Sequence, residues 1–198
     1  MNTSIRTALA VALATALYVP LAQALTLVDT QANGATVNTS FSTTDTIAAD
    51  LDFPTAGQVT LAFALDAGDI TRGTALFNGI VNNLSSTALA SLQVSVNRGT
   101  LTPGSVLSND GSSVLSRPSA NTVDISFTTP LTTFVELGDP LLQGRQDWTV
   151  GFAGLATGDT ITVTWTAAPV PEPGTWALLA GGLGLLGVQA RHTRRRGG

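Results

Sequence analysis

The chain has 198 residues, of which 11% are charged and 43% hydrophobic, and its formal net charge is −4. This composition excludes a disordered polyelectrolyte, and the acidic balance excludes a basic nucleic-acid binder. Cysteine and lysine are absent and the only histidine is His192, which excludes a disulfide framework, a zinc–thiolate site and a cysteine nucleophile.

Residues 1–24 have the layout of a secretory signal peptide. A single arginine precedes an apolar run at residues 7–19, and small residues follow at Ala22 and Ala24 in the A-x-A spacing that signal peptidase cleaves. The run is too short to cross a bilayer comfortably. We therefore expect an N-terminal signal helix that is cut between Ala24 and Leu25. A buried N-terminal helix is the alternative, disfavoured because the run is apolar on all faces.

Residues 25–168 are predicted to form one Thr- and Ser-rich domain. Apolar and polar residues alternate in several short segments, which is typical of half-buried strands. The clearest segments are 59–65, 92–96, 123–127, 148–152 and 161–165, and weaker ones are 25–29, the surroundings of Phe41, 76–81 and 132–137. We expect an all-β fold, an antiparallel β-sandwich of the jelly-roll or immunoglobulin-like kind.

Turn residues separate these segments. Glycine occurs together with Asn, Asp or Pro at 33–34, 54–57, 67–69, 103–104, 109–111, 138–140 and 158–159. Asn78-Gly79 is predicted as a further turn, or as a tight hairpin inside its own apolar stretch. The segment 79–91 is the expected place of one short helix.

The domain is chemically sparse, because residues 25–168 contain no His, Cys, Lys or Tyr. A Ser-His-Asp triad, a Cys-His pair and a lysine Schiff base are therefore excluded. A pair of carboxylates for glycoside hydrolysis remains open. Most acidic residues lie beside turn residues, where Asp routinely caps the backbone, so we expect no enzyme. The candidate carboxylates are Asp50, Asp52, Asp66, Asp69, Asp124, Glu136, Asp139 and Asp147.

Three acidic stretches could supply the oxygen ligands that calcium prefers. These stretches are Asp50-Leu51-Asp52, residues 66–69 and Asn109-Asp110. None matches the D-x-D-x-D-G calcium loop, so we expect solvated turn aspartates, no metal site and no cofactor.

The domain's only two tryptophans, Trp148 and Trp165, are in phase with apolar strand faces. We therefore expect them in the core, which weakens a glycan-binding interpretation. A row formed by Thr160, Thr162, Thr164 and Thr166 is interpreted as an ordinary solvent-facing strand and not as an ice-binding surface.

Residues 169–198 divide into three zones in a fixed order. Residues 170–174 hold the proline-rich Val170-Pro171-Glu172-Pro173, residues 175–190 are apolar, and the end carries Arg191, Arg194, Arg195 and Arg196. A helix over 175–190 would reach about 24 Å, short of a hydrocarbon core of about 30 Å. We expect a short transmembrane helix suited to temporary retention, with the arginines as a cytoplasmic stop.

This order of zones resembles the PEP-CTERM sorting signal of Gram-negative bacteria, which also carries the label ice-binding protein C-terminal domain. The resemblance implies recognition by exosortase, a membrane cysteine transpeptidase or protease. Val170, Pro171, Glu172 and Pro173 would then be recognised residues and not catalytic ones. An ordinary single-pass anchor with a proline-rich stalk is the alternative.

The resemblance also implies a route and a function. The precursor would be held in the inner membrane facing the periplasm, and the product would reach the cell surface or the extracellular matrix. Signal peptidase and exosortase would process it, and exopolysaccharide or biofilm would be its surroundings. We expect a non-enzymatic protein that binds no nucleic acid. The alternative is a glycan-binding or calcium-dependent adhesion module delivered by the same route.

Overall fold

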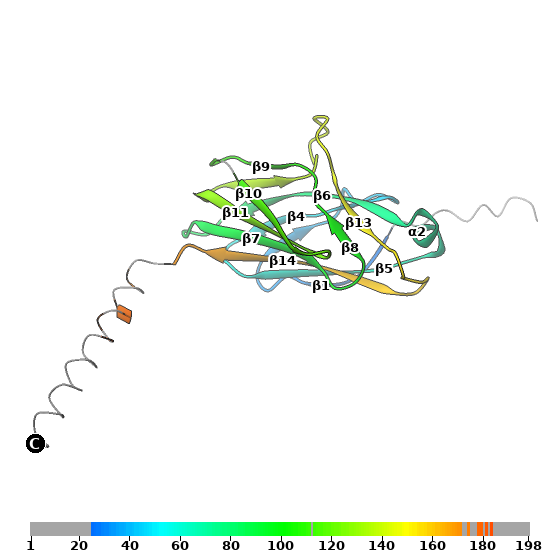
Figure 1. The fold of residues 1–198 in the computed structure, drawn as a ribbon, viewed down its shortest axis with the longest axis horizontal. Coiled ribbons are helices and arrows are strands. Elements are labelled where there is room, and N and C mark those ends of the chain that lie inside the picture. Colours follow the sequence, from blue (N-terminus) through cyan, green and yellow to red (C-terminus); the bar gives the residue numbers. More distant parts are fainter. Residues whose placement is uncertain are drawn as a thin grey trace, which may run out of the picture.

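A computed structural model describes residues 25–111 and 113–171, together with 174, 178, 179, 181 and 183. The described part is mostly strand (Figure 1). In chain order its elements are β1 (Thr26–Gln31), β2 (Thr36–Asn38), β3 (Thr46–Ala48), β4 (Asp50–Phe53), β5 (Gln58–Ala64), α2 (Ala67–Arg72), β6 (Thr74–Asn83), β7 (Leu89–Val96), β8 (Thr100–Thr102), β9 (Val106–Ser108), β10 (Ser113–Ser119), β11 (Thr122–Leu131), β12 (Phe134–Leu137), β13 (Trp148–Gly151) and β14 (Thr160–Pro169).

The strands form two sheets, so the predicted β class is confirmed. One sheet has the order β1-β5-β14-β7-β11-β10, and the other has β2-β4-β6-β12-β9 with β3 and β13 also beside β6 and β8 beside β13. Ten pairings are antiparallel, but β3 and β4 both run parallel to β6, unlike the expected all-antiparallel arrangement. The reason is that β5, which lies between β4 and β6 in the chain, belongs to the other sheet, so the chain returns in the same direction.

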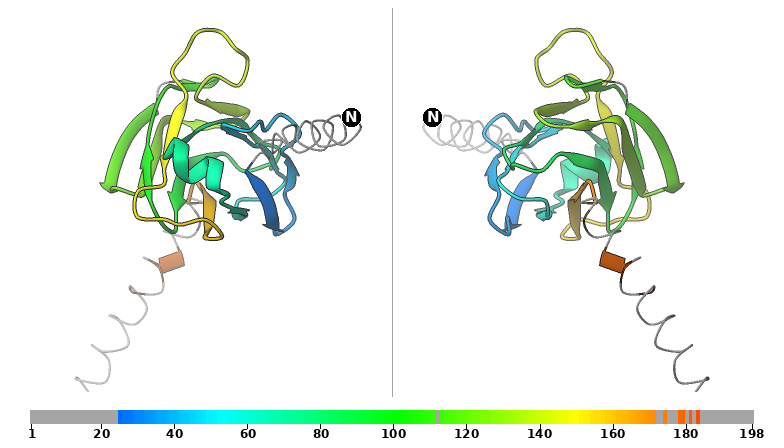
Figure 2. Two further views of the ribbon diagram at one scale, coloured as in Figure 1. Left: turned by 90° about the vertical axis from the view of Figure 1, so that its right-hand side faces the viewer. Right: turned by 90° about the vertical axis from the view of Figure 1, so that its left-hand side faces the viewer.

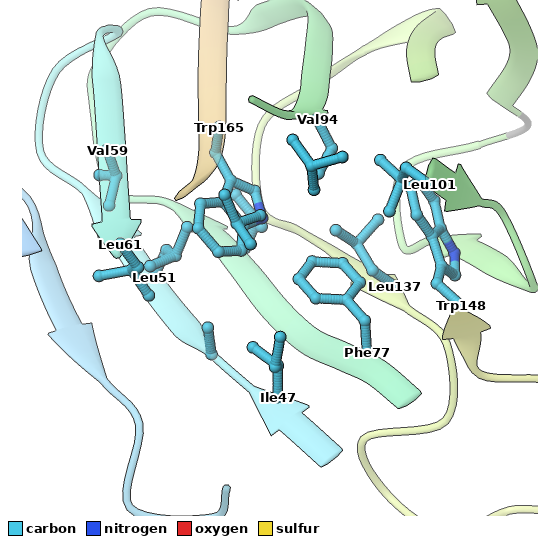
Figure 3. Close-up of a cluster of buried hydrophobic side chains, with 14 of the residues drawn as sticks. Ile47, Leu51, Val59, Leu61, Phe77, Val94, Leu101, Leu137, Trp148 and Trp165 are labelled. Carbon is cyan, nitrogen blue, oxygen red and sulfur yellow. The ribbon is translucent and has the colours of Figure 1, made fainter. Parts of the chain in front are cut away.

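One apolar core lies between the two sheets (Figure 3). Trp148 and Trp165 are fully buried, as their phase predicts. Phe77 of β6 contacts Trp148 of β13 at a centroid distance of 5.9 Å and Trp165 of β14 at 5.6 Å. Because Trp165 belongs to the six-stranded sheet and Phe77 to the other, this aromatic group joins the two layers.

The predicted turn at Asn78-Gly79 is wrong, because both residues lie inside β6. A Cβ on Gly79 would lie 2.0 Å from the Ala49 carbonyl oxygen. The glycine therefore permits a close approach of two backbones and does not reverse the chain. The helix expected at 79–91 is also wrong, since this segment holds the end of β6, a loop and the start of β7.

The helix is found instead at α2, where residues 67–69 were predicted as a turn. The Asp66 side chain accepts the Asp69 N–H and the Asp69 side chain accepts the Asp66 N–H, both at 2.8 Å, which is a capping box. Gly73, with φ of 73°, ends the helix. The weak strand around Phe41 is not formed, and Phe41 is 67% exposed in the loop between β2 and β3.

The two ends of the described chain leave the domain at opposite ends of the sandwich (Figures 1 and 2). Thr26 at the start of β1 and Thr160 at the start of β14 both pair with Ala64. Pro169, at the other end of β14, pairs with Leu89. We call the end that contains the loops 54–57 and 84–88 and residues 169–171 the tail-side end.

Candidate functional site

Strand β14 runs directly into the predicted sorting motif. It pairs with β5 and β7, and the Ala167 N–H still donates to the Gly57 carbonyl oxygen at 2.8 Å. Beyond the strand, the Val170 N–H donates to the Ala88 carbonyl oxygen at 2.9 Å. Val170 is therefore fixed to the domain and Pro171 follows it, whereas the predicted motif residues Glu172 and Pro173 lie outside the described residues.

A pocket of about 450 Å³ adjoins the start of this motif. Its lining comes from residues 54–56, 85–87 and 169–171, and none of these residues has an ionisable side chain. Thr55 and Ser86 are exposed at its rim, and Leu84, beside it in the chain, is 65% exposed. The motif thus begins against an uncharged surface made of hydroxyl groups and small apolar groups.

The structure describes only a few residues of the predicted membrane segment 175–190. Of these, Leu178, Leu179 and Leu183 have helical backbone and are 80%, 54% and 63% exposed. These leucines are therefore not packed into the core of the domain. Among the described residues, no helix is long and apolar enough to cross a membrane. The predicted cytoplasmic stop, Arg191, Arg194, Arg195 and Arg196, lies outside the described residues.

At the other end of the chain, the predicted cleavage site is described only in part. Ala22 and Ala24 lie outside the described residues. Leu25, the residue after the predicted cut, is 5% exposed and belongs to the apolar core. The predicted cut thus lies directly before the first core residue.

Five of the candidate carboxylates are dispersed and engaged in local contacts. Asp50 and Asp52, expected in an acidic loop, lie on β4, where they accept hydrogen bonds from the Ile80 N–H and the Asn82 amide. Asp66 and Asp69 form the capping box of α2, and Asp124 accepts a hydrogen bond from Gln93. These contacts are typical of carboxylates that stabilise the fold.

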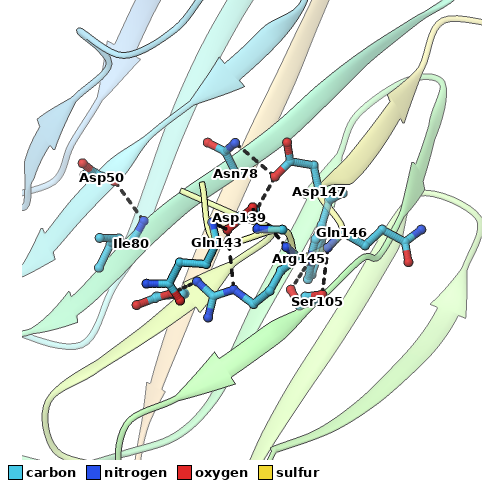
Figure 4. A network of polar contacts seen from close by, with 12 residues as sticks. Asp50, Asn78, Ile80, Ser105, Asp139, Gln143, Arg145, Gln146 and Asp147 are labelled. Carbon is cyan, nitrogen blue, oxygen red and sulfur yellow. Dashed lines mark hydrogen bonds and ion pairs between the residues drawn. The ribbon is translucent and has the colours of Figure 1, made fainter. Parts of the chain in front are cut away.

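The remaining three carboxylates are Glu136 on β12 and Asp139 and Asp147 in the loop between β12 and β13. Figure 4 shows Asp139 and Asp147 beside Arg145, which also pairs with Glu136. Asp147 accepts the Asp139 N–H at 2.7 Å and the Asn78 amide at 3.1 Å. Arg145 forms ion pairs with Glu136 and Asp139. Each of the three carboxylates therefore has an ion-pair or hydrogen-bond partner. The hydrogen bond between Asp147 and Asn78 attaches the loop to the middle of β6.

Asp139 organises the loop from within. Its two carboxylate oxygens accept the N–H groups of Gln143, Gly144 and Arg145 at 2.7, 2.7 and 3.0 Å. Burial raises the pKa of Asp139, but these three donors and the Arg145 charge outweigh it, and the pKa lies below the ordinary value of 3.8. Among the described residues, no group of three His, Cys, Asp or Glu side chains could hold a metal ion.

Sequence reasoning missed the parts of this loop that come from elsewhere in the chain. Arg145 and Asn78 were not predicted to belong to a functional site, and Gly138 was predicted only as part of a turn. A Cβ on Gly138 would lie 2.7 Å from Asp147 Oδ1, so this glycine also permits a close approach. The one signal available was that the domain has only four arginines, one of which, Arg145, stands between the predicted turn at 138–140 and the predicted strand at 148–152.

Comparison with known proteins identifies a sequence motif in the last thirty residues. Residues 169–196 match the family model of the PEP-CTERM protein-sorting motif. Searches of curated proteins and of solved structures gave no match. The matched range begins at the last residue of β14 and contains all four predicted motif residues and the four arginines near the end. The chain therefore carries a PEP-CTERM protein-sorting signal, which marks it as an exported protein targeted by exosortase.

Proposed function

We propose that the chain is a non-enzymatic protein of the cell surface or extracellular matrix. In this proposal the tail holds the precursor in the inner membrane until exosortase removes it, and the β-sandwich, released into exopolysaccharide or biofilm, is the functional product. The observation that carries it is the family match over residues 169–196. The exposed leucines at 178, 179 and 183 support it, because a segment free of the core can enter a bilayer.

Intact mass spectrometry of the mature protein tests this proposal. We expect a chain that begins at Leu25 and lacks the arginines at 191–196. Glu172→Ala in the predicted motif should retain the tail, whereas Glu136→Gln in the domain should be processed normally. Arginines that remain attached to the mature wild-type protein would contradict the sorting step.

A second candidate is a glycan-binding module, favoured by the outer face of the six-stranded sheet. There Ser95, Thr164 and Thr60 stand in one row across three strands. Gln93, Thr166 and Gln58 form the neighbouring row. Neighbouring rows of hydroxyl and amide groups can donate to and accept from a polysaccharide.

Thermal unfolding in the presence of the host exopolysaccharide, with and without calcium, tests the second candidate. A binding module should be stabilised by its ligand, since binding to the folded state raises the midpoint. Thr60→Val with Thr164→Val should remove that shift. If neither exopolysaccharide nor calcium changes the midpoint of the wild-type protein, this candidate is eliminated.

A further inference from the structure

We infer that exosortase contacts the tail-side end of the domain together with the motif. The loops at 54–56 and 85–87 are then part of the recognised substrate. This inference rests on the proposed function and adds a surface to it. Its basis is the short path from the fold to the motif, the pocket at that place and the distribution of charge over the domain.

The path from the fold to the motif is too short to separate them. Val170 is hydrogen-bonded to Ala88, and an extended chain spans at most about 3.6 Å per residue. Pro173 is therefore within about 11 Å of the last fixed residue. An enzyme that encloses Pro171, Glu172 and Pro173 must also meet the loops on either side of Val170.

The folded surface beside the motif is accessible. The loops that line the pocket are the nearest folded surface, and at Thr55 and Ser86 they are exposed.

The chemistry of this surface specifies its partner. The described lining of the pocket has no ionisable group and combines Ser and Thr hydroxyls with Pro, Ala and Val. By contrast, the opposite end of the domain carries the ion pairs Arg72–Asp69 and Arg98–Asp159. The pocket lining is therefore suited to an uncharged loop of small and apolar residues on the sorting enzyme. A described carboxylate at this end, Asp110, is occupied by hydrogen bonds from Thr132 and Thr133.

Bulky charged substitutions at the rim test this surface. In full-length protein produced in cells that contain exosortase, we expect Ser86→Arg and Thr55→Arg to slow tail removal at least fivefold, followed by pulse-chase and intact mass. Both side chains are exposed, and thermal unfolding of the purified variants checks that the fold is retained. Thr157→Arg, an exposed turn residue at the opposite end, is the matched control and should leave the rate unchanged.

An insertion separates contact with the domain from recognition of the motif. Ten Gly and Ser residues between Pro169 and Val170 should restore normal processing to Ser86→Arg, because the arginine is then far from the enzyme. Processing of Ser86→Arg at the wild-type rate without the insertion would overturn the inference. Retention of the tail in the unsubstituted chain would contradict the proposed function itself.

A charge reversal distinguishes the enzyme from the lipid surface. Contact with the enzyme predicts that Ser86→Glu and Ser86→Arg both slow processing, because each places a bulky charge in an uncharged interface. Contact with anionic lipid headgroups predicts that only Ser86→Glu slows it. This second result would overturn the inference in favour of membrane docking.

Discussion

Strands β6 and β14 are both ten residues long and both lie inside their sheets, but their neighbours differ. β14 has β5 on one side and β7 on the other. β6 exchanges both neighbours halfway along, β3 for β4 on one side and β13 for β12 on the other. A strand that keeps the same neighbours needs only alternating apolar and polar residues. A strand that changes neighbours also needs particular residues, such as Gly79 on β6, at the point of change.

Gly79→Ala is expected to give the largest effect, because it acts where β6 changes neighbours. The new methyl would lie 2.0 Å from the Ala49 carbonyl oxygen, so the two backbones must separate. We expect the free energy of unfolding to fall by about 3 kcal/mol, measured by urea denaturation. Gly57→Ala, with its nearest atom at 3.9 Å, is the control and should change it by less than about 1 kcal/mol. An unchanged midpoint for Gly79→Ala would contradict the close approach.

The two tryptophans sharpen the comparison, since Trp148 pairs with β6 and Trp165 lies on β14. Both are fully buried, so Phe at either site loses a similar apolar area. However, Trp148 Nε1 donates to the Ser105 carbonyl oxygen at 2.9 Å, whereas Trp165 Nε1 has no partner among the described residues. We expect Trp148→Phe to destabilise more than Trp165→Phe by about 1 kcal/mol. Equal losses in thermal unfolding would contradict this difference.

Acid should weaken the fold at the carboxylates that flank these strands. The pKa of Asp139, beside β6, and that of Asp159, directly before β14, both lie below 3.8. For Asp159 the cause is its hydrogen bonds from Arg98 and from the Ala156 N–H. Because the folded chain keeps these carboxylates ionised to a lower pH, the unfolded chain takes up protons first, and stability falls progressively as pH drops from about 5 through 3.8.

Three further aspartates set the balance of this acid effect. Burial raises the pKa of Asp110, but hydrogen bonds from Thr132 and Thr133 outweigh it and lower the pKa, so Asp110 acts in the same direction as Asp139. Hydrogen bonds from Thr43 and Thr46 lower the pKa of Asp45, so it acts in the same direction as Asp139. Burial raises the pKa of Asp69, which acts in the opposite direction. We expect the melting temperature to fall between about pH 5 and about pH 3. The Asp139→Asn variant should show a smaller fall. A melting temperature of the wild-type protein that does not change over this range would contradict the lowered pKa of Asp139.

The smallest effect is expected on the outer face of β14. Thr164 is half-buried there, and its hydroxyl lies 3.3 Å from that of Thr60. Thr164→Ala removes one cross-strand contact without opening the core, so the unfolding free energy should fall by about 0.5 kcal/mol. A loss as large as that of Gly79→Ala would mean that β14 also depends on a special contact.

The comparison also explains what could be predicted from the sequence. The alternating strands were found because each has one face in the core, and the tail was found because its zones differ in composition. Gly79 was misassigned because the glycine is required by the close approach of Ala49, which lies between β3 and β4 and is distant in the sequence. In the same way, Asp139 and Asp147 were expected as turn aspartates, and their link to Arg145 and Asn78 depends on contacts that only the folded chain brings together.

Leu25 precedes Thr26, which lies level with the start of β14, and Pro169 is the last residue of β14, and this placement has a consequence for the orientation of the proposed precursor. A ten-residue strand is about 30 Å long, as wide as the hydrocarbon layer is thick. A folded precursor still inserted through both its leader and its tail would have to lie flat along the bilayer. In the proposed route, cutting the leader first would free one end, and the domain could then turn upright on its tail and point its opposite end away from the lipid.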